Sequence, residues 1–151
     1  MGPDGTTSGT AESDGSGDTA YFATYPPHTA AIADARHAFE AWFEGVAPGS
    51  PVLDEMLVVL SELLANAVAA SAEGGGAVAV RAWLTDEVTL EVTDPADAVF
   101  DVGAHWDYDD PLRPGGRGLM IVESLVDDLA IEPPTDARPL RVRCRRSLRS
   151  S

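Results

Sequence analysis

Apolar residues recur along the chain with two different periods, and these periods predict where helices and strands lie. From His28 to Glu44 the apolar residues have the spacing of one buried helix face, and Gly45 stands where such a helix would end. A stronger pattern of the same kind runs from Val52 to Ser71, and a further one runs from Gly118 to Leu129. We therefore expect amphipathic helices in these three segments.

Short segments with alternating or aromatic side chains predict strands. Ala20 to Tyr25 is rich in aromatic residues and is followed by two prolines. The runs Ala77–Leu84 and Glu87–Thr93 flank a short polar turn and predict a β-hairpin. Leu140 to Arg146 alternates like a strand, and Ala130–Glu132 is a further short candidate. These segments predict a sheet built partly from chain neighbours.

The order of these elements predicts an α+β fold. We expect the helices to pack on one face of a mixed, mostly antiparallel sheet, because the hairpin breaks the strict alternation that a doubly wound parallel sheet needs. The loop from Val99 to Gly116 is longer than an ordinary connection. Residues 1–19 are mainly Gly, Ser, Thr and Asp, so we expect a disordered acidic tail before one domain over residues 20–148.

Composition narrows the function classes. The 151 residues carry 10 Lys plus Arg against 25 Asp plus Glu, a formal net charge of −15. This charge argues against general nucleic-acid binding and against anionic membranes, because both need a basic surface. No apolar run approaches the ~20 residues of a membrane span, and Met1–Ser16 lacks the regions of a signal peptide. With Cys144 as the only cysteine, we expect a cytoplasmic protein in which this residue is buried.

Three places carry residues suited to chemistry. Glu62 and Asn66 are four residues apart and leave one face of the predicted helix, where their oxygens suit a water and a divalent cation; an exposed acid and an ordinary helix amide are the alternative. Asp94 ends a strand, as binding residues often do, or simply forms a turn before Pro95. Gly115–Gly118 opens a helix where the backbone can approach an anion, or is merely the end of a loop.

In this order and spacing, the three places resemble the ATP-binding domain of the GHKL superfamily, which includes DNA gyrase and histidine kinases. The likeness is strongest to the small single-domain branch of bacterial anti-sigma factor serine kinases and their actinobacterial relatives. Leu60–Ala67 resembles the N-box, SELxxNA, and Thr93–Pro95 stands at the G1 box. Gly116–Val122 resembles the G2 box, GxGLxIV. The resemblance runs from about Ala20 to Arg146 and implies the Bergerat-type α/β sandwich of that superfamily.

The resemblance implies a role for each matching residue, with ATP and Mg²⁺ as cofactors. Glu62 matches the general base that activates a protein serine hydroxyl, and Asn66 matches the Mg²⁺ ligand. Asp94 matches the carboxylate that accepts a hydrogen bond from the adenine amino group. The loop Val99–Gly115 corresponds to the mobile lid over the nucleotide. The positions that match the segment closing around the phosphates are Gly116, Arg117, Gly118 and Leu119.

The resemblance also implies a transcription regulator. Such a protein phosphorylates a STAS-type anti-sigma factor antagonist, sequesters a sigma factor when that antagonist is absent, or does both. Relatives often form homodimers, and the acidic charge adds the expectation of no direct contact with nucleic acid or membrane. The G1 pattern, DxGxG, reads Asp94-Pro95-Ala96-Asp97-Ala98 here, without its glycines. The alternatives are therefore a non-catalytic nucleotide-sensing or protein-binding module, and a scaffold that keeps the fold alone.

Basic residues gather at the end of the chain. Six of the ten arginines lie in the last fourteen residues: Arg138, Arg141, Arg143, Arg145, Arg146 and Arg149. They could form a patch for nucleic acid, but the acidic excess favours pairing with the protein's own carboxylates. His28, His37 and His105 lack the spacing of zinc ligands, so we expect no zinc site.

Overall fold

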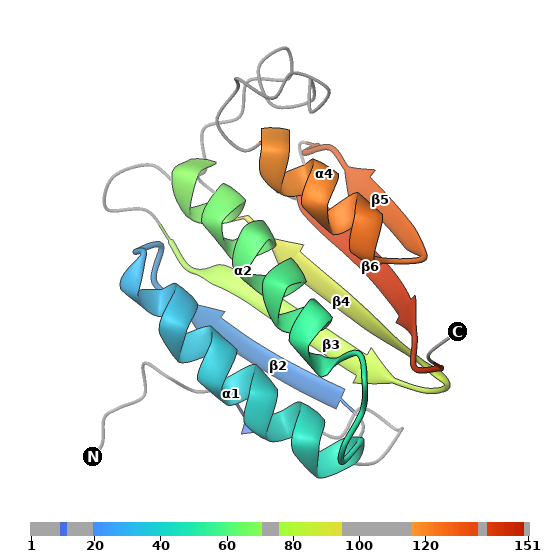
Figure 1. Cartoon of the computed structure of the whole chain (residues 1–151). Helices are drawn as coiled ribbons and strands as arrows, with labels where there is room; N and C mark the ends of the chain where they lie inside the picture. The colour runs from blue at the N-terminus through green and yellow to red at the C-terminus, as the bar shows by residue number, and fades with distance from the viewer. Residues whose placement is uncertain (1–9, 12–19, 71–75, 95–115, 136–138, 150–151) are drawn as a thin grey trace, which may run out of the picture.

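A computed structural model describes residues 10–11, 20–70, 76–94, 116–135 and 139–149. The strands are β1 (Thr10–Ala11), β2 (Ala20–Tyr25), β3 (Val78–Leu84), β4 (Glu87–Thr93), β5 (Asp128–Glu132) and β6 (Arg141–Ser147). The helices are α1 (Ala30–Val46), α2 (Leu53–Ala70) and α4 (Gly116–Leu125). The strands form one sheet in the order β1-β2-β3-β4-β6-β5, and the helices cover one of its faces (Figure 1).

This arrangement confirms the predicted α+β class. All five strand pairings among the described residues are antiparallel, including the predicted hairpin of β3 and β4. The helix layer packs through α1 on α2 and α2 on α4, and no helix in the described ranges is long and apolar enough to cross a membrane. Inside the range expected to be a tail, Thr10–Ala11 pair with β2 at Phe22 and Tyr21.

The third predicted helix was too long at its end. It ends at Leu125, and Asp128 already belongs to β5. Extending it would place two neighbouring carboxylates at the helix C-terminus, where the helix dipole disfavours negative charge. The backbone N–H of Asp127 instead donates to the carbonyl of Arg145 at 2.8 Å, and the Asp128 carboxylate pairs with the Arg145 side chain at 3.2 Å.

The first predicted helix, His28–Glu44, was displaced along the chain: α1 begins at Ala30 and ends at Val46, two residues later at each end. It continues through Gly45, and the N–H of Ala47 donates to the carbonyl of Phe43 at 2.7 Å. The chain reverses at Gly49 instead, where φ is +70°, a left-handed conformation that glycine adopts without steric cost. The predicted end of this helix was therefore two residues early.

The core lies between the helix layer and the sheet. Alternate side chains of the strands point into it, and Cys144 on β6 is fully buried there, as predicted. Under α1, the rings of Tyr21, Phe39 and Trp42 pack with centroids 5.6 to 6.1 Å apart. The hydroxyls of Tyr21 and Tyr25 share a hydrogen bond of 2.6 Å, so these buried polar atoms satisfy each other.

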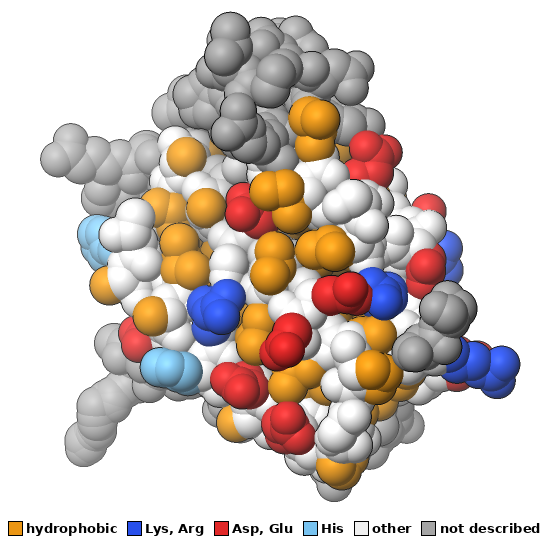
Figure 2. Space-filling view, in the orientation of Figure 1, with side chains coloured by type: hydrophobic (Ala, Val, Ile, Leu, Met, Phe, Trp, Pro, Cys, Tyr) orange, Lys and Arg blue, Asp and Glu red, His pale blue; other side chains and the backbone are white. Residues whose placement is uncertain are grey.

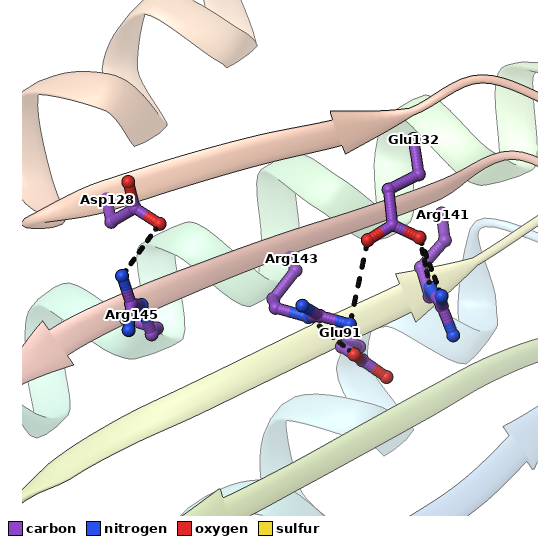
Figure 3. Close-up of polar contacts among 6 residues, drawn as sticks. All are labelled: Glu91, Asp128, Glu132, Arg141, Arg143 and Arg145. Carbon is purple, nitrogen blue, oxygen red and sulfur yellow. Dashed lines mark hydrogen bonds and ion pairs between the residues drawn. The ribbon is translucent and has the colours of Figure 1, made fainter.

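The opposite face of the sheet carries a ladder of ion pairs (Figure 3). Arg141, Arg143 and Arg145 alternate along β6 with the buried Val142 and Cys144, so the three guanidinium groups stand on the face away from the helices. Their carboxylate partners come from β4 and β5, and these are Glu87, Glu91, Asp128 and Glu132. We call these seven residues the ion-pair ladder.

One arginine of β6 lies on the side of the sheet that the helices cover. Arg146 contacts the carbonyl of Leu125, at the end of α4, and the carboxylate of Glu55 on α2. The prediction that these arginines pair with the protein's own acids is therefore confirmed for four of the six, while Arg138 lies outside the described residues.

Candidate functional site

The second helix places Glu62 and Asn66 on one side of the helix layer. Its first turn is prepared by Ser50, whose hydroxyl accepts a hydrogen bond from the N–H of Val52 at 3.3 Å. Asp54 and Glu55 then add negative charge where the helix dipole favours it. The apolar stripe of α2 is buried, whereas Glu62 and Asn66 are half-buried. Within the described part of the chain, neither side chain makes a hydrogen bond.

The first turn of α4 lies directly against Glu62. A Cβ built on Gly118 would meet Glu62 Oε1 at only 2.6 Å, so the carboxylate rests where any other residue would place its side chain. Gly118 and the following Leu119 are both buried. The structure therefore brings the predicted N-box acid and the predicted G2 segment into contact, although they are separated by more than fifty residues.

Asp94 follows the last residue of β4 and is held by its backbone. Its N–H donates to the carbonyl of Leu140 at 2.9 Å, which ties it to the chain entering β6. The residue is only 6% exposed, and burial raises the pKa of its carboxyl to about 7. No other described residue donates a hydrogen bond to this carboxylate. Burial disfavours the charged form of a carboxylate, so Asp94 is a candidate for contact with a ligand that donates a hydrogen bond.

The elements that carry these residues meet at one end of the molecule. The C-terminal half of α2, the start of α4 and the end of β4 all lie toward the same end in Figure 1. Gly116, Arg117, Gly118 and Leu119 form the first turn of α4, which begins two residues earlier than the apolar pattern predicted. The predicted lid and the altered G1 residues after Asp94 lie outside the described residues.

One residue near this site did not stand out in the sequence. The guanidinium of Arg36 on α1 donates to Ser61 Oγ at 2.7 Å and to the carbonyl of Leu57 at 3.2 Å. The Ser61 hydroxyl in turn donates to the same carbonyl at 2.8 Å. Arg36 therefore fixes α1 to α2 immediately before Glu62. Its position four residues after Ile32, on the edge of the apolar stripe, was the available signal.

A described cavity lies elsewhere. It has a volume of about 480 Å³ and is lined by residues that include Glu55, Leu125 and Arg146, at the end of α4 away from Gly118. It contains none of the predicted site residues. Among the described residues, no group of three His, Cys, Asp or Glu side chains is arranged to hold a metal ion.

Comparison with known proteins identifies the family of this chain. Residues 25–143 match the family described as histidine kinase-like ATPase domain. The chain belongs to that family. Comparison with curated proteins gave no match. The match spans most of the chain and includes all of the predicted N-box, G1 and G2 segments. The GHKL-type class inferred from the motifs is thus confirmed, and family membership supports an ATP-binding regulatory role.

Proposed function

We propose that this histidine kinase-like ATPase domain works as an anti-sigma factor serine kinase. It binds Mg-ATP at the end of α2, β4 and α4, phosphorylates a serine of a STAS-type anti-sigma factor antagonist, and sequesters a sigma factor when that antagonist is absent. The observation that carries the proposal is the contact between Glu62 and the first turn of α4. It puts a carboxylate beside a helix N-terminus, the backbone feature best suited to phosphate.

In the proposed reaction, the carboxylate of Glu62 acts as the general base. The serine oxygen forms a bond to the γ-phosphorus as the bond from that phosphorus to the β–γ bridging oxygen breaks. The hydroxyl proton passes to Glu62, and ADP leaves. Such a transfer needs mainly positioning and charge stabilisation, which the free N–H groups at the start of α4 supply to the phosphate oxygens.

Asp94 is proposed to select adenine. Its ionised carboxylate accepts a hydrogen bond from the exocyclic amino group, and guanine offers a carbonyl oxygen at the equivalent place. The support comes from burial: the residue is only 6% exposed, and no described residue donates a hydrogen bond to its carboxylate. A ligand that donates to it therefore relieves a cost already present in the folded protein.

The residues present fit a magnesium ion. Mg²⁺ prefers oxygen ligands and usually combines one or two protein groups with phosphates and water. The half-buried carboxamide of Asn66, four residues after Glu62 and without a hydrogen-bond partner in the described ranges, offers such an oxygen. Asn66 would hold the ion, which would neutralise phosphate charge.

The surface around Glu62 supports a protein as the phosphate acceptor. The large hydrophobic side chains that are exposed among the described residues are Val58, Met120 and Ile121. Val58 precedes Glu62 by one helical turn, and the other two closely follow Gly118. Hydrophobic side chains gather over the adjoining parts of α2 and α4 in Figure 2. Exposed apolar clusters of this kind mark protein-binding surfaces.

A second candidate is a module that binds nucleotide or a partner protein without catalysis. The sequence after Asp94 favours it, because Ala96 and Ala98 stand where the G1 pattern has glycines. Pro95 and Ala96 restrict the backbone, and Asp97 adds a negative charge. In this case Mg-ATP binds without transfer, or only the partner protein binds.

Calorimetric titration with Mg-ATP and Mg-ADP tests the proposed site. We expect the wild type to bind both, and Asp94→Ala to lower the affinity by roughly 10- to 100-fold, the value of a hydrogen bond to a charged group. Asn66→Ala should weaken Mg-ATP binding but have little effect when EDTA removes the metal. Asp86→Asn, an exposed acid at the other end of β4, is the matched control.

The outcomes separate the candidates. Absence of heat with the wild type at high micromolar nucleotide would contradict the kinase and favour the protein-binding module. If nucleotide binds, incubation of the chain with labelled ATP and STAS-type antagonists tests transfer. Labelled phosphoserine on an antagonist supports the kinase, whereas binding without labelling of any antagonist supports the nucleotide sensor. Co-purification with sigma factors, with and without the antagonist, tests sequestration.

A further inference from the structure

Gly118 occupies a helical position that does not require glycine for its backbone. Among the described residues, only Gly49 has a positive φ, so Gly118 has a conformation that any residue adopts. It lies inside α4, and glycine is the least favourable helix residue after proline. The helix would therefore be more stable with alanine here, and the reason for glycine must lie outside the helix.

That reason is the contact with Glu62. A Cβ at position 118 would lie 2.6 Å from Glu62 Oε1, 3.5 Å from its Cδ and 3.8 Å from its Cβ. The first distance is far below van der Waals contact, so one of the two groups would have to move. The obstructing atom is the end of a flexible side chain, so the carboxylate would move and the backbone of α4 would stay.

We propose that Gly118 is a positioning residue for Glu62: by lacking a side chain, it admits the Glu62 carboxylate to the first turn of α4. This differs from the role that the motif implies for Gly118, in which its backbone closes around phosphate. The inference rests on the proposed function, in which Glu62 is the base. Any side chain at position 118 displaces the carboxylate from the place where the serine hydroxyl meets the phosphate.

A second helical glycine provides a matched control. Gly45 lies inside α1, it is exposed, and a Cβ built on it meets nothing within 4 Å. Gly45→Ala and Gly118→Ala therefore make the same chemical change in a helix, and only the second one introduces a methyl group against Glu62.

We expect Gly118→Ala to separate stability from activity. The midpoint of urea unfolding should be unchanged or raised in both glycine variants, because alanine favours the helix. The transfer rate of Gly118→Ala should fall by roughly 10- to 100-fold, since ~1 Å of misplacement at a reacting group costs that order of rate. Its Kd for Mg-ATP should stay within about twofold of the wild type. Gly45→Ala should retain the wild-type rate.

The decisive comparison uses a shorter acid. Glu62→Asp withdraws the carboxylate by one methylene group and leaves room for the methyl group of alanine at 118. In that background, Gly118→Ala should change the transfer rate by no more than about twofold, a strong departure from additivity. An equal loss in both backgrounds, or a weakened Kd for Mg-ATP in Gly118→Ala alone, would overturn the proposal, because Gly118 would then act on the nucleotide.

Unfolding measurements without nucleotide test the contact between Gly118 and Glu62 directly. Gly118→Ala should raise the unfolding midpoint more in a Glu62→Ala background than in the wild type, because no carboxylate then has to move away from the methyl group. An equal effect of Gly118→Ala on the midpoint in the two backgrounds would overturn the proposal. A wild-type chain that binds no Mg-ATP would contradict the proposed function alone, and this stability cycle would still decide on the contact.

Discussion

Two groups of carboxylates in this molecule differ in whether arginine side chains pair with them. In the ion-pair ladder, each acid of β4 and β5 contacts an arginine of β6, and Arg143 even joins Glu91 and Glu132 (Figure 3). At the candidate site, Glu62 and Asp94 have no arginine or histidine partner among the described residues. The carboxylates of the ladder are paired with arginines inside the fold, whereas those of the site have no such pair among the described residues.

The difference lies in what holds each acid. Strand register fixes the ladder, since Glu91 stands directly opposite Arg143 and Asp128 directly opposite Arg145. At the site, no countercharge among the described residues holds the acids. Glu62 fits against α4 because Gly118 has no side chain, and Asp94 is enclosed by the fold. Leaving a buried acid unpaired costs stability. We infer that the cost is offset when nucleotide and substrate supply the missing partners.

The largest expected effect comes from removing the charge of Glu62. Glu62→Gln should lower the rate of phosphate transfer by about 10²- to 10⁴-fold, the usual contribution of a general base. The free energy of unfolding should change by less than about 0.5 kcal/mol, because a half-buried side chain without partners stabilises little. Transfer assays and urea unfolding measure the two effects.

Glu123→Gln is the control for this variant, because Glu123 is an exposed acid on the neighbouring helix α4. Both its rate and its stability should match the wild type. Phosphate transfer that continues undiminished in Glu62→Gln would remove Glu62 from the role of base and leave the two groups of carboxylates chemically alike.

The next effect is the pH dependence that Asp94 gives to stability. Burial raises the pKa of its carboxyl from 3.8 to about 7, so the folded state holds a proton that the unfolded state releases above pH 4. Its contribution, on the order of 4 kcal/mol, is therefore complete below pH 4 and is lost as pH rises to about 7. Urea unfolding from pH 4 to 8 should show this decline, and Asp94→Asn should abolish it.

Nucleotide affinity should change in the opposite direction. The ionised Asp94 carboxylate accepts a stronger hydrogen bond from the adenine amino group than the protonated acid does, so the affinity for Mg-ADP should fall as pH decreases below about 7. Calorimetry in buffers of different ionisation enthalpy should detect proton release on binding at pH 6. A pH-independent affinity would show that Asp94 does not meet the adenine amino group.

Most of the fold was predictable because local patterns and the core agree. β2 and β4 have the predicted bounds, and α2 differs from its prediction by one residue at each end. The errors arose where distant residues decide. Gly45 allows a helix to end but does not force it, and the fate of Asp128 depends on Arg145, seventeen residues later.

The sequence predicted which residues form the candidate site, but it did not predict their burial or their contacts. The four-residue spacing placed Glu62 and Asn66 on one face, since helix geometry alone determines that. The backbone of Asp94 is held by a hydrogen bond to Leu140, far along the chain, and the contact of Glu62 with Gly118 depends on how α2 and α4 pack. No local pattern contains these contacts, so neither the raised pKa of Asp94 nor the reason for Gly118 was visible in the sequence.

The smallest effect is expected in the ladder, where Arg143→Ala leaves Glu91 buried without its partner. The Glu91 side chain is only 6% exposed and accepts a bond of 2.7 Å from Arg143 Nε. Loss of one member of a buried pair costs about 3 kcal/mol or more, and the partial exposure of Arg143 favours the lower value. Urea unfolding should therefore show a loss of about 3 kcal/mol, with Mg-ATP affinity unchanged in the folded protein.

Arg145→Ala is the matched control, because its ion pairs with Glu87 and Asp128 are exposed and contribute at most about 1 kcal/mol. Arg143→Met combined with Glu91→Leu should recover most of the lost stability, since an apolar pair of similar size removes the buried charge. Equal losses from Arg143→Ala and Arg145→Ala would mean that water reaches Glu91. The ladder would then resemble an ordinary charged surface, and only the site would hold acids that the fold shields from water.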